Sequence, residues 1–335
     1  MRFAPKGQAP SRTVESAGTR VFGYGQGVFH EVVLAGLTPD TEYDYQIRSG
    51  DGAWTPRRTF RTAPASEDAV FVFLAGSDTK GAHDVLSELF RRFETDEPRF
   101  MVYAGDAPHH GDLAAHWDRW FAAVEPFASQ RPIMPSTGNH ELGASRSLAN
   151  YQTYNALPPS PGNEAYYSFD YGPVHFVSLD TESVSLAKQL PWLEKDLAAT
   201  DKPWKVVYGH GPPFSSGTVH GSRRDLRNVL GPMFGKHRVN LVLSGHDHLY
   251  ERSKPIDLAK SKDAPVNSYR EGTCYVVSAG AGAGLYGAKP GNWWTAVLKT
   301  GVHHLCRVKV NGSKSMLLEA VDQEGRVIDA VTLDN

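Results

Sequence analysis

Residues 240–252 read NLVLSGHDHLYER, a short apolar run followed by a glycine and two closely spaced histidines. Four other apolar runs end in a similar way, at a turn with coordinating side chains. They are VFVFLAGSDTKG at 70–81, FMVYAGDAPHHG at 100–111, IMPSTGNHE at 133–141 and WKVVYGHGPPF at 204–214. Each run predicts a buried strand because it is short, apolar and bounded by turn residues. Ligands of open α/β sheets bind beyond the carboxyl ends of the strands, so these five ends predict one shared site.

The polar residues at these strand ends are of the types that bind metal ions. They are Asp78, Asp106, His109, Asn139, His140, His210, His246 and His248. Any one of them alone also fits a turn or a helix cap, because Asp and Asn are common in both. Five such ends in one chain favour a metal site over five unrelated turns. His246 and His248 form the strongest single pair, since residues two apart in an extended loop project toward the same ions.

The ligand types narrow the choice of metal. Carboxylate, imidazole and amide groups without thiolates suit Fe, Mn, Zn or Co better than Ca²⁺ or a cysteine-bound structural zinc. Two ions roughly 3.5–4 Å apart need a bridging ligand, and a carboxylate bridges through its two oxygens. Asp106 is the candidate bridge. Such a pair polarises phosphoryl oxygens and lowers the pKa of a bound water toward ~7, so the sequence predicts a two-metal hydrolytic centre.

Residues 65–335 read as a large α/β (α+β) domain, because apolar strands alternate with amphipathic helices. Helices are expected over 83–95, 113–128, 184–199 and 223–235. Strands are expected over 70–76, 100–105, 133–138, 174–180, 205–209, 239–245 and 274–279. Residues 303–333 alternate in hydrophobicity around Asn311-Gly312 and Glu324-Gly325, which predicts an antiparallel edge to the sheet.

Residues 1–64 read instead as a small all-β module. Alternating residues such as Tyr43 and Tyr45 lie between turn residues at short spacing. The stretch LAGLTPDTEY at 34–43 resembles a strand, corner and strand of a fibronectin type III module. Such a sandwich normally needs roughly 100 residues, so we expect a module that is trimmed at its first strands or reduced and covered by the neighbouring domain. Residues 62–68 read as the linker.

Composition excludes several classes of function. A net charge of -2 with 40% hydrophobic residues is ordinary for a soluble globular protein, so no nucleic-acid partner is expected. No apolar run approaches the roughly 18 residues of a membrane span, and residues 1–10 lack the apolar stretch of a secretory leader. Cys274 and Cys306 lie in strand-like runs and are interpreted either as buried free thiols or as one disulfide.

In this order, the five motifs resemble those of the calcineurin-like metallophosphoesterases. The front module and Tyr250-Glu251-Arg252 make the chain most similar to the purple acid phosphatase branch. The resemblance implies a ββ-sandwich flanked by helices that binds two transition-metal ions. It places one ion on Asp78, Asp106, His109 and His248, and the other on Asp106, Asn139, His210 and His246. It also implies that His140 acts as a general acid or phosphate donor and that Glu141 orients it.

The chain departs from that family at three positions. Purple acid phosphatases carry a tyrosine where this chain has His109, so we expect a colourless centre. The wider superfamily has a ligand histidine where this chain has Lys80, which is interpreted as a phosphate contact or as a solvated surface lysine. One histidine of a pair is missing beside His220, which is the candidate leaving-group contact. His110 is a further candidate substrate contact or neighbour of the ligands.

These features predict a hydrolase of small phosphate esters, with a phosphomonoesterase as the first choice and a phosphodiesterase or phosphotriesterase as alternatives. The alternative from another class is a binding protein that uses the β module and keeps an inactive site. The intact ligand set argues against it. By resemblance, the protein is expected to be secreted or periplasmic, although no leader is present in this chain.

Other residues have weaker claims. His30, His175, His303 and His304 lie in strand patterns and are interpreted as structural. The glycine-rich run at 279–285 lacks the Lys and Ser or Thr of a P-loop, so we expect it to let the backbone pass close to the site. Tyr286, Trp293 and Trp294 fit either the pocket mouth or the core.

Overall fold

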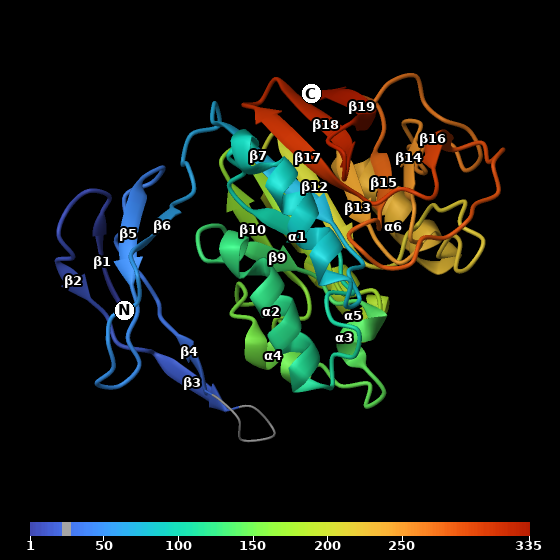
Figure 1. The fold of residues 1–335 in the computed structure, drawn as a ribbon. Helices are drawn as coiled ribbons and strands as arrows, with labels where there is room; N and C mark the ends of the chain where they lie inside the picture. Colours follow the sequence, from blue (N-terminus) through green and yellow to red (C-terminus); the bar gives the residue numbers. More distant parts are fainter. Residues whose placement is uncertain (22–27) are drawn as a thin grey trace.

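The computed structural model describes residues 1–21 and 28–335. A small β module and a large domain lie side by side in it (Figure 1). The module contains a four-stranded antiparallel sheet. Its order is β2 (Arg12–Thr13), β1 (Arg2–Pro5), β5 (Glu42–Gln46) and β6 (Arg58–Arg61). A separate antiparallel pair joins β3 (Gly18–Val21) to β4 (Val28–Glu31).

The turn before β5 is fixed by a tyrosine. The hydroxyl of Tyr43 accepts a 2.9 Å hydrogen bond from the backbone N–H of Thr38. A tyrosine that bonds back to the upstream chain in this way holds a corner between strands of a β-sandwich. Its ring stacks on Phe60 with centroids 5.5 Å apart, and the fully buried Phe3 packs edge-on against it. The corner expected at 34–43 is present and leads into β5, but residues 32–41 before it form no strand. The described elements of the module are all β-strands.

The large domain is a sandwich of two sheets. The seven-stranded sheet has the order β10 (Tyr167–Tyr171), β11 (Val174–Leu179), β12 (Trp204–Gly209), β13 (Leu241–Ser244), β15 (Cys274–Ser278), β14 (Tyr250–Ser253) and β16 (Thr295–Lys299). The six-stranded sheet has the order β19 (Val327–Asp334), β18 (Ser315–Asp322), β17 (His304–Asn311), β7 (Val70–Gly76), β8 (Met101–Tyr103) and β9 (Ile133–Pro135). Apolar side chains of both sheets form one buried core between them, as Phe73 and Phe176 illustrate.

Parallel strands lie within each of these sheets. β7, β8 and β9 are parallel neighbours in one sheet, and β11, β12, β13 and β15 are parallel neighbours in the other. Parallel strands have their carboxyl ends at the same edge of a sheet. Because the interior between the sheets is apolar, polar functional groups are expected at those edges.

Helices cover the outer face of each sheet through apolar side chains. On the six-stranded sheet lie α1 (His83–Arg92), α2 (Ala114–Ala128) and α4 (Ala149–Tyr154), and Leu89 and Trp117 pack toward Met101 of β8. On the seven-stranded sheet lie α5 (Leu186–Ala199) and α6 (Arg224–His237), where Leu193 joins the core that contains Val207. The short α3 (Asn139–Leu142) and a 3₁₀-helix (Glu94–Asp96) complete the domain. The predicted ββ-sandwich flanked by helices is confirmed.

The predicted elements are present, with two instructive differences. The strands expected over 100–105 and 133–138 end at Tyr103 and Pro135, because the chain leaves the sheet there to form the site described below. In the large domain, α3, α4, β10, β14 and β16 were not expected. The predicted antiparallel tail over 303–333 is confirmed as β17, β18 and β19. Gly312 and Gly325 adopt φ values of 55° and 82° in its two turns.

Several side observations settle earlier alternatives. Cys274 and Cys306 are buried free thiols, so the disulfide alternative is not realised. His175 is buried between the carboxylates of Asp170 and Asp196, in keeping with the structural role expected of it.

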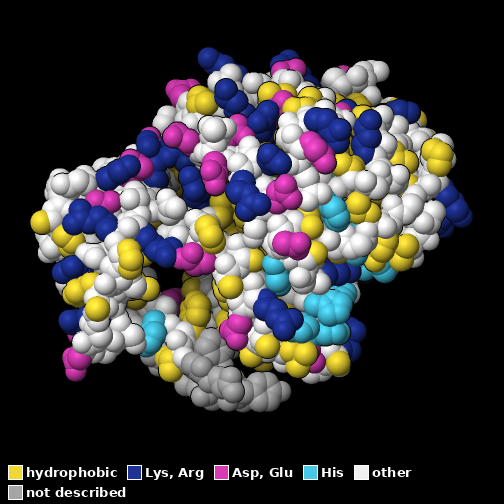
Figure 2. All heavy atoms as spheres, viewed as in Figure 1, with side chains coloured by type: hydrophobic (Ala, Val, Ile, Leu, Met, Phe, Trp, Pro, Cys, Tyr) yellow, Lys and Arg dark blue, Asp and Glu magenta, His cyan; other side chains and the backbone are white. Residues whose placement is uncertain are grey.

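Across 1–21 and 28–335, no helix combines the length and the apolar character needed to cross a membrane. Figure 2 shows Lys and Arg side chains interspersed with Asp and Glu on one face of the molecule, and His side chains gathered on one part of it.

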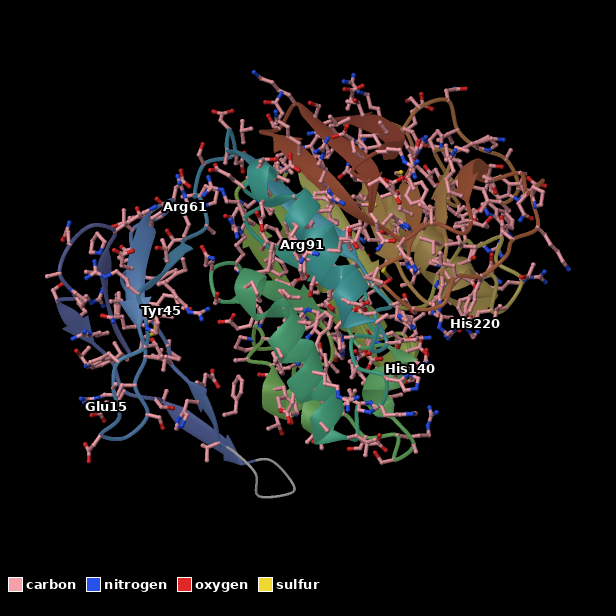
Figure 3. All side chains as sticks on the ribbon, viewed as in Figure 1. Glu15, Tyr45, Arg61, Arg91, His140 and His220 are labelled. Atoms are coloured by element: carbon pink, nitrogen blue, oxygen red, sulfur yellow. The ribbon has the colours of Figure 1, made fainter. Side chains whose placement is uncertain are left out.

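The module is fastened to the end of α2. The hydroxyl of Tyr45 donates a 2.5 Å hydrogen bond to the carbonyl of Ser129, and Arg58 forms an ion pair with Glu125. Tyr45 also faces the large domain in Figure 3. The division between residues 64 and 65 remains a prediction.

Candidate metal centre

The predicted ligands come together at one end of the sandwich. The six-stranded sheet contributes Asp78 after β7, Asp106 after β8 and Asn139 after β9. The seven-stranded sheet contributes His210 after β12, and His246 and His248 after β13. His140 and His220, from segments 80 residues apart, lie at this same end in Figure 3. Both sheets thus supply ligands because the carboxyl ends of their parallel strands meet there.

Asn139, His210, His246 and Asp106 form the tightest cluster. Nε2 of His210 lies 3.1 Å from Oδ1 of Asn139, 3.1 Å from Nδ1 of His246 and 3.3 Å from Oδ2 of Asp106. One potential ligand atom from each of Asp106, His210 and His246 lies within 4.8 Å of the others. Nδ1 of His210 donates to the carbonyl of Ala104 at 2.8 Å, which turns Nε2 toward the cluster. These four side chains fit one metal ion.

Asp78, Asp106 and His248 form the adjoining cluster. Oδ1 of Asp78 lies 3.3 Å from Nε2 of His248. Both atoms are buried without a hydrogen-bond partner, and so is Oδ2 of Asp106. The other atom of each group is bonded, since Nδ1 of His248 donates to the Gly284 carbonyl and Oδ2 of Asp78 accepts from the Ser77 hydroxyl. Buried polar atoms without partners are costly, so these three fit a second metal ion.

The backbone is strained at the same place. Asp78, Lys80, Asp106 and His246 adopt φ values of 66°, 46°, 61° and 73°. A non-glycine residue in the left-handed region costs on the order of 1–3 kcal/mol, and such residues gather at functional sites. The strain lies where each chain segment leaves its strand and turns a ligand into the cluster.

Charges in the cluster favour a bound cation. Burial opposes the charge of His210, but the carboxylates of Asp106 and Asp78 raise its pKa to about 10. Burial likewise opposes the charge of Lys80, yet the same carboxylates raise its pKa. Burial and the neighbouring His210 lower the pKa of His246 to about 3, so that imidazole is neutral and free to ligate. The carboxylates therefore attract positive charge to this point.

Lys80 lies inside the cluster. Its Nζ is 3.1 Å from Oδ2 of Asp106, and only 12% of its side chain is exposed. Nζ of Lys80 and Oδ2 of Asp106 form an ion pair, but their geometry is not that of a hydrogen bond. Of the two roles considered for Lys80, the solvated surface lysine is wrong, because the side chain points inward to the carboxylate.

His109 is not placed among the other ligands. Its side chain is exposed, and its ring packs on His110 and His140 with centroids 4.4 and 5.6 Å away. Its backbone carbonyl accepts a 2.6 Å hydrogen bond from Nδ1 of His140. Lys80 is the side chain found beside Asp106 instead. His110 is exposed as well, so the ligand role of His109 and the substrate role of His110 remain predictions.

His140 lies at the rim of the cluster. Its backbone N–H donates to Oδ1 of Asp106 at 2.9 Å, and its ring Nε2 lies 3.9 Å from Oδ2 of the same residue. The expected orienting role of Glu141 is wrong, because the His109 carbonyl holds the His140 ring. Glu141 is buried beneath the site and accepts from the N–H groups of Gly138, Asp106 and Ala107 at 2.6, 2.8 and 2.8 Å. Burial raises the pKa of Glu141 to about 7. Its carboxylate fixes the backbone that presents Asp106.

Aromatic rings cover the cluster from the other side. The ring of His220 stacks on His246 with centroids 3.8 Å apart, and Tyr286 stacks on His248 at 4.0 Å. Tyr286 thus lines the site, whereas Trp294 belongs to the core. The sequence could not distinguish the roles of these two residues, since both are aromatic and follow the same glycine-rich run.

The glycine-rich run does bring backbone close to the ligands. The N–H of Ala281 donates to the Ser77 carbonyl at 3.1 Å, and that of Ala283 to the Asp78 carbonyl at 2.8 Å. A Cβ on Gly282 would lie 2.7 Å from the carbonyl oxygen of Ala82. The close backbone passage expected for 279–285 is confirmed.

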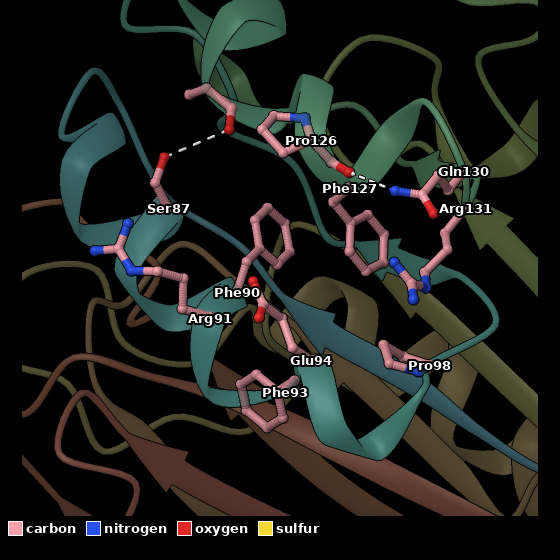
Figure 4. Close-up of a pocket in the computed structure, with 11 residues that line it drawn as sticks. Ser87, Phe90, Arg91, Phe93, Glu94, Pro98, Pro126, Phe127, Gln130 and Arg131 are labelled. Carbon is pink, nitrogen blue, oxygen red and sulfur yellow. Dashed lines mark hydrogen bonds between the residues drawn. The ribbon is translucent and has the colours of Figure 1, made fainter. Parts of the chain in front are cut away.

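A cavity of about 450 Å³ lies elsewhere, between α1 and α2 (Figure 4). The stacked rings of Phe90 and Phe127, 4.7 Å apart, form part of its wall. None of the predicted ligands lines this cavity. This cavity is therefore separate from the candidate metal centre.

Comparison with known families agrees with this geometry. The model of the calcineurin-like phosphoesterase family matches residues 71–250, and that of the purple acid phosphatase N-terminal domain matches residues 1–62. Purple acid phosphatase 22 of Arabidopsis thaliana is 30% identical over 259 residues, which cover 73% of this chain and 58% of the relative. Acid phosphatase type 7 of Homo sapiens is 28% identical over 347 residues, which cover 90% of this chain and 76% of that protein. The chain thus spans less than two thirds of the plant relative.

A solved structure shows the same fold. The purple acid phosphatase PPD1 from yellow lupin (Lupinus luteus) seeds superposes with a TM-score of 0.87 at 22% identity. The match covers 99% of this chain and 68% of that one, so both the β module and the sandwich are included. A structure of PhoD is more distant, with a TM-score of 0.68 at 16% identity.

Proposed function

The chain belongs to the calcineurin-like phosphoesterase family, and from this premise we propose that it hydrolyses phosphate esters, phosphomonoesters first among them, at two bound metal ions. One observation carries the proposal. Three buried atoms without hydrogen-bond partners, on Asp78, Asp106 and His248, adjoin the cluster of Asp106, Asn139, His210 and His246. Oδ2 of Asp106 meets the Lys80 ammonium, and Oδ1 of Asp78 meets Nε2 of His248, without a hydrogen bond. A chain that only bound a partner through its β module would have no reason to keep these charged groups buried.

The proposed division of ligands follows the two clusters. Asp78, Asp106 and His248 would hold one ion, and Asp106, Asn139, His210 and His246 the other, so Asp106 would contribute to both. When bound, such ions polarise the phosphoryl oxygens and lower the pKa of a bound water toward ~7. The donor set suits Fe, Mn, Zn or Co. His109 stays a candidate fourth ligand of the first ion.

Three side chains around the clusters would act on the substrate. His140, at the rim, would donate a hydrogen bond or a proton to the phosphate ester. Lys80 would pair with a phosphate oxygen, because its ammonium already lies beside the bridging carboxylate. His220 stacks on His246 and would contact the leaving group. We propose, from family resemblance alone, that the protein acts outside the cytoplasm.

The test is hydrolysis of chromogenic phosphomonoesters, phosphodiesters and phosphotriesters by protein reconstituted with Mn, Zn, Fe or Co. We expect the monoester to be turned over fastest. Asp106→Asn is the matched control, since it keeps the shape of the bridging side chain and removes its charge. Absence of turnover of all three ester types with every metal would overturn the proposal.

Metal analysis separates the enzyme from an inactive relative. Purified and reconstituted protein is expected to hold close to two transition-metal ions per chain. Fewer than one ion per chain would favour a binding protein whose site has lost its metals.

A further inference from the structure

The loop at 215–221 forms one wall of the candidate site. It connects β12 to α6 and carries His220, whose ring stacks on His246 with centroids 3.8 Å apart. The N–H and the hydroxyl of Thr218 both donate to the Gly287 carbonyl at 3.0 Å. That contact joins the loop to the segment that carries Tyr286, and the rings of His220 and Tyr286 are 5.7 Å apart. The position of the loop therefore sets the position of both rings.

Asp247 lies at the centre of this loop although it belongs to another segment. Its side chain is fully buried. Oδ2 accepts hydrogen bonds from the Ser215 hydroxyl at 2.6 Å and from the N–H of Gly221 at 2.8 Å, and Oδ1 accepts from the N–H of His220 at 3.2 Å. Hydrogen bonds to an ionised carboxylate are stronger than those between neutral groups. Both ends of the loop are thus bonded to one carboxylate.

The place of Asp247 in the sequence explains its direction. It stands between His246 and His248, which both contribute to the ligand clusters. The chain bends at this point, because His246 adopts a φ of 73° in the left-handed region, and the side chain of Asp247 takes a different direction from those of its two neighbours. Here that direction leads into the loop. One short segment therefore presents two ligands and also holds the site wall.

The loop is shaped around the carboxylate. A Cβ on Gly217 would lie 2.4 Å from the carboxyl carbon of Asp247, which leaves no room for a side chain. A second buried carboxylate supports the neighbouring residue, because Glu251 accepts from the N–H and the hydroxyl of Ser216, each at 2.6 Å. Glu251 also accepts from the Thr295 hydroxyl at 2.6 Å. The conformation of the loop at 215–221 therefore depends on the positions of the Asp247 and Glu251 carboxylates.

We propose that Asp247 is a positioning residue for substrate binding, which acts through His220 by holding the loop at 215–221 against the metal ligands. This inference rests on the proposed phosphoesterase function. The hydrogen bonds described for the Asp247 side chain go to Ser215, His220 and Gly221 of the loop. Its loss should loosen the wall that meets the leaving group and leave the ligand clusters intact.

The experiment compares Asp247→Ala and Asp247→Asn with wild type in the full-length protein reconstituted with metal. With p-nitrophenyl phosphate as substrate, we expect KM to rise about tenfold in Asp247→Ala, a factor that loss of hydrogen bonds to a charged group supplies. Metal content should stay unchanged and kcat should change less than KM. Loss of metal in step with activity would overturn the proposal, because Asp247 would then support the ligands.

A double-mutant cycle with His220→Ala tests whether Asp247 acts through His220. We expect Asp247→Ala to have little further effect on KM when His220 is already absent, since coupled residues are not additive. Additive effects would contradict the proposal. Ser215→Ala removes one hydroxyl and keeps the carboxylate, so it gives a smaller rise in KM should Asp247→Ala fail to fold. Asp322→Ala is the control, because this buried aspartate caps the β18–β19 turn and should cost stability with no change in KM.

Two further measurements keep this inference apart from the proposed function. Amide hydrogen exchange at His220 and Gly221 should accelerate in Asp247→Ala whether or not an ester is hydrolysed. Binding of inorganic phosphate, which lacks the leaving group that His220 would contact, should weaken by a smaller factor than the rise in KM. If wild type hydrolyses no ester, the phosphoesterase proposal fails, while unchanged exchange at these amides would overturn the role of Asp247.

Discussion

The positive charge of Lys80 lies next to the first metal position. Its ammonium lies 3.1 Å from Oδ2 of Asp106, the carboxylate that would bridge both ions. A protonated amine cannot coordinate a metal, and it repels a cation that approaches the same carboxylate. The first position, at Asp78 and His248, should therefore bind its ion more weakly than the second, which Asn139, His210 and His246 supply with additional ligands.

Replacing Lys80 tests this competition. In Lys80→His, a neutral imidazole takes the place of the ammonium, so we expect metal retained after dialysis to rise toward two ions per chain. Lys80→Met removes the charge without adding a ligand and serves as the matched control, with retention between the two. Elemental analysis measures the ratio of metal to protein. Equal or lower retention in Lys80→His than in wild type would contradict a competing role for the ammonium.

Colour provides a second test at the scale of single residues. Because His109 stands where purple acid phosphatases have a tyrosine, the iron-loaded protein should show no tyrosinate charge-transfer band in the visible spectrum. Tyr286 is a phenol in contact with a ligand, since its ring stacks on His248 with centroids 4.0 Å apart. A visible band that disappears in Tyr286→Phe would show that this tyrosine, placed by the fold rather than by the motif, binds the metal.

At the scale of secondary-structure elements, His175 joins three segments. Nδ1 of His175 on β11 lies 2.7 Å from Oδ1 of Asp170 on β10, and Nε2 lies 2.8 Å from Oδ2 of Asp196 on α5. Burial opposes the charged imidazole, but the hydrogen bonds to Asp196 and Asp170 raise the pKa of His175 above its ordinary value. The edge of the seven-stranded sheet is thus held by a histidinium between two carboxylates.

This arrangement predicts a pH-dependent contribution to stability. A raised pKa in the folded state means that the contribution is complete below the unfolded pKa of about 6.5 and is lost as the pH rises through the folded pKa. At about pH 5.5, His175→Gln should lower the free energy of unfolding by roughly 1–3 kcal/mol. Urea unfolding at about pH 5.5 and about pH 9 measures the difference between wild type and variant, which should shrink at the higher pH. A difference that grows with pH would contradict the assignment.

At the scale of the whole molecule, the β module contacts the end of α2. The described contacts of Tyr45 with Ser129 and of Arg58 with Glu125 involve none of the candidate ligands. Pairs of this kind each contribute about 1 kcal/mol or less. The module should therefore detach more readily than the sandwich unfolds.

The double variant Tyr45→Phe/Arg58→Ala tests that independence. We expect faster proteolytic cleavage within residues 62–68, while kcat/KM and metal content stay within about twofold of wild type because the lost contacts are worth little. Arg57→Ala is the control, since it removes an ion pair with Asp44 inside the module. A large fall in kcat/KM would show instead that the docked module shapes the site.

The amino-acid sequence by itself determined the elements and the inventory of the site. Short apolar runs bounded by glycine predicted β7, β12 and β13, because a strand that is buried on both faces is apolar along nearly its whole length. Coordinating residues directly after those runs predicted the clusters, because strands of one parallel set end at one edge. These inferences depend on local chain geometry, which neighbouring residues specify.

Only the tertiary structure decided which side chains meet. His109 and Lys80 are both close in sequence to a ligand, and the fold turns Lys80 inward and leaves His109 exposed. The carboxylate of Glu141 lies beneath the site instead of beside the His140 ring. The side chain of Asp247 contacts a loop that contains Ser215, 32 residues earlier in the chain. Side-chain direction after a strand depends on strained φ values and on packing against distant segments. Those constraints come from the meeting of two sheets, which no local pattern records.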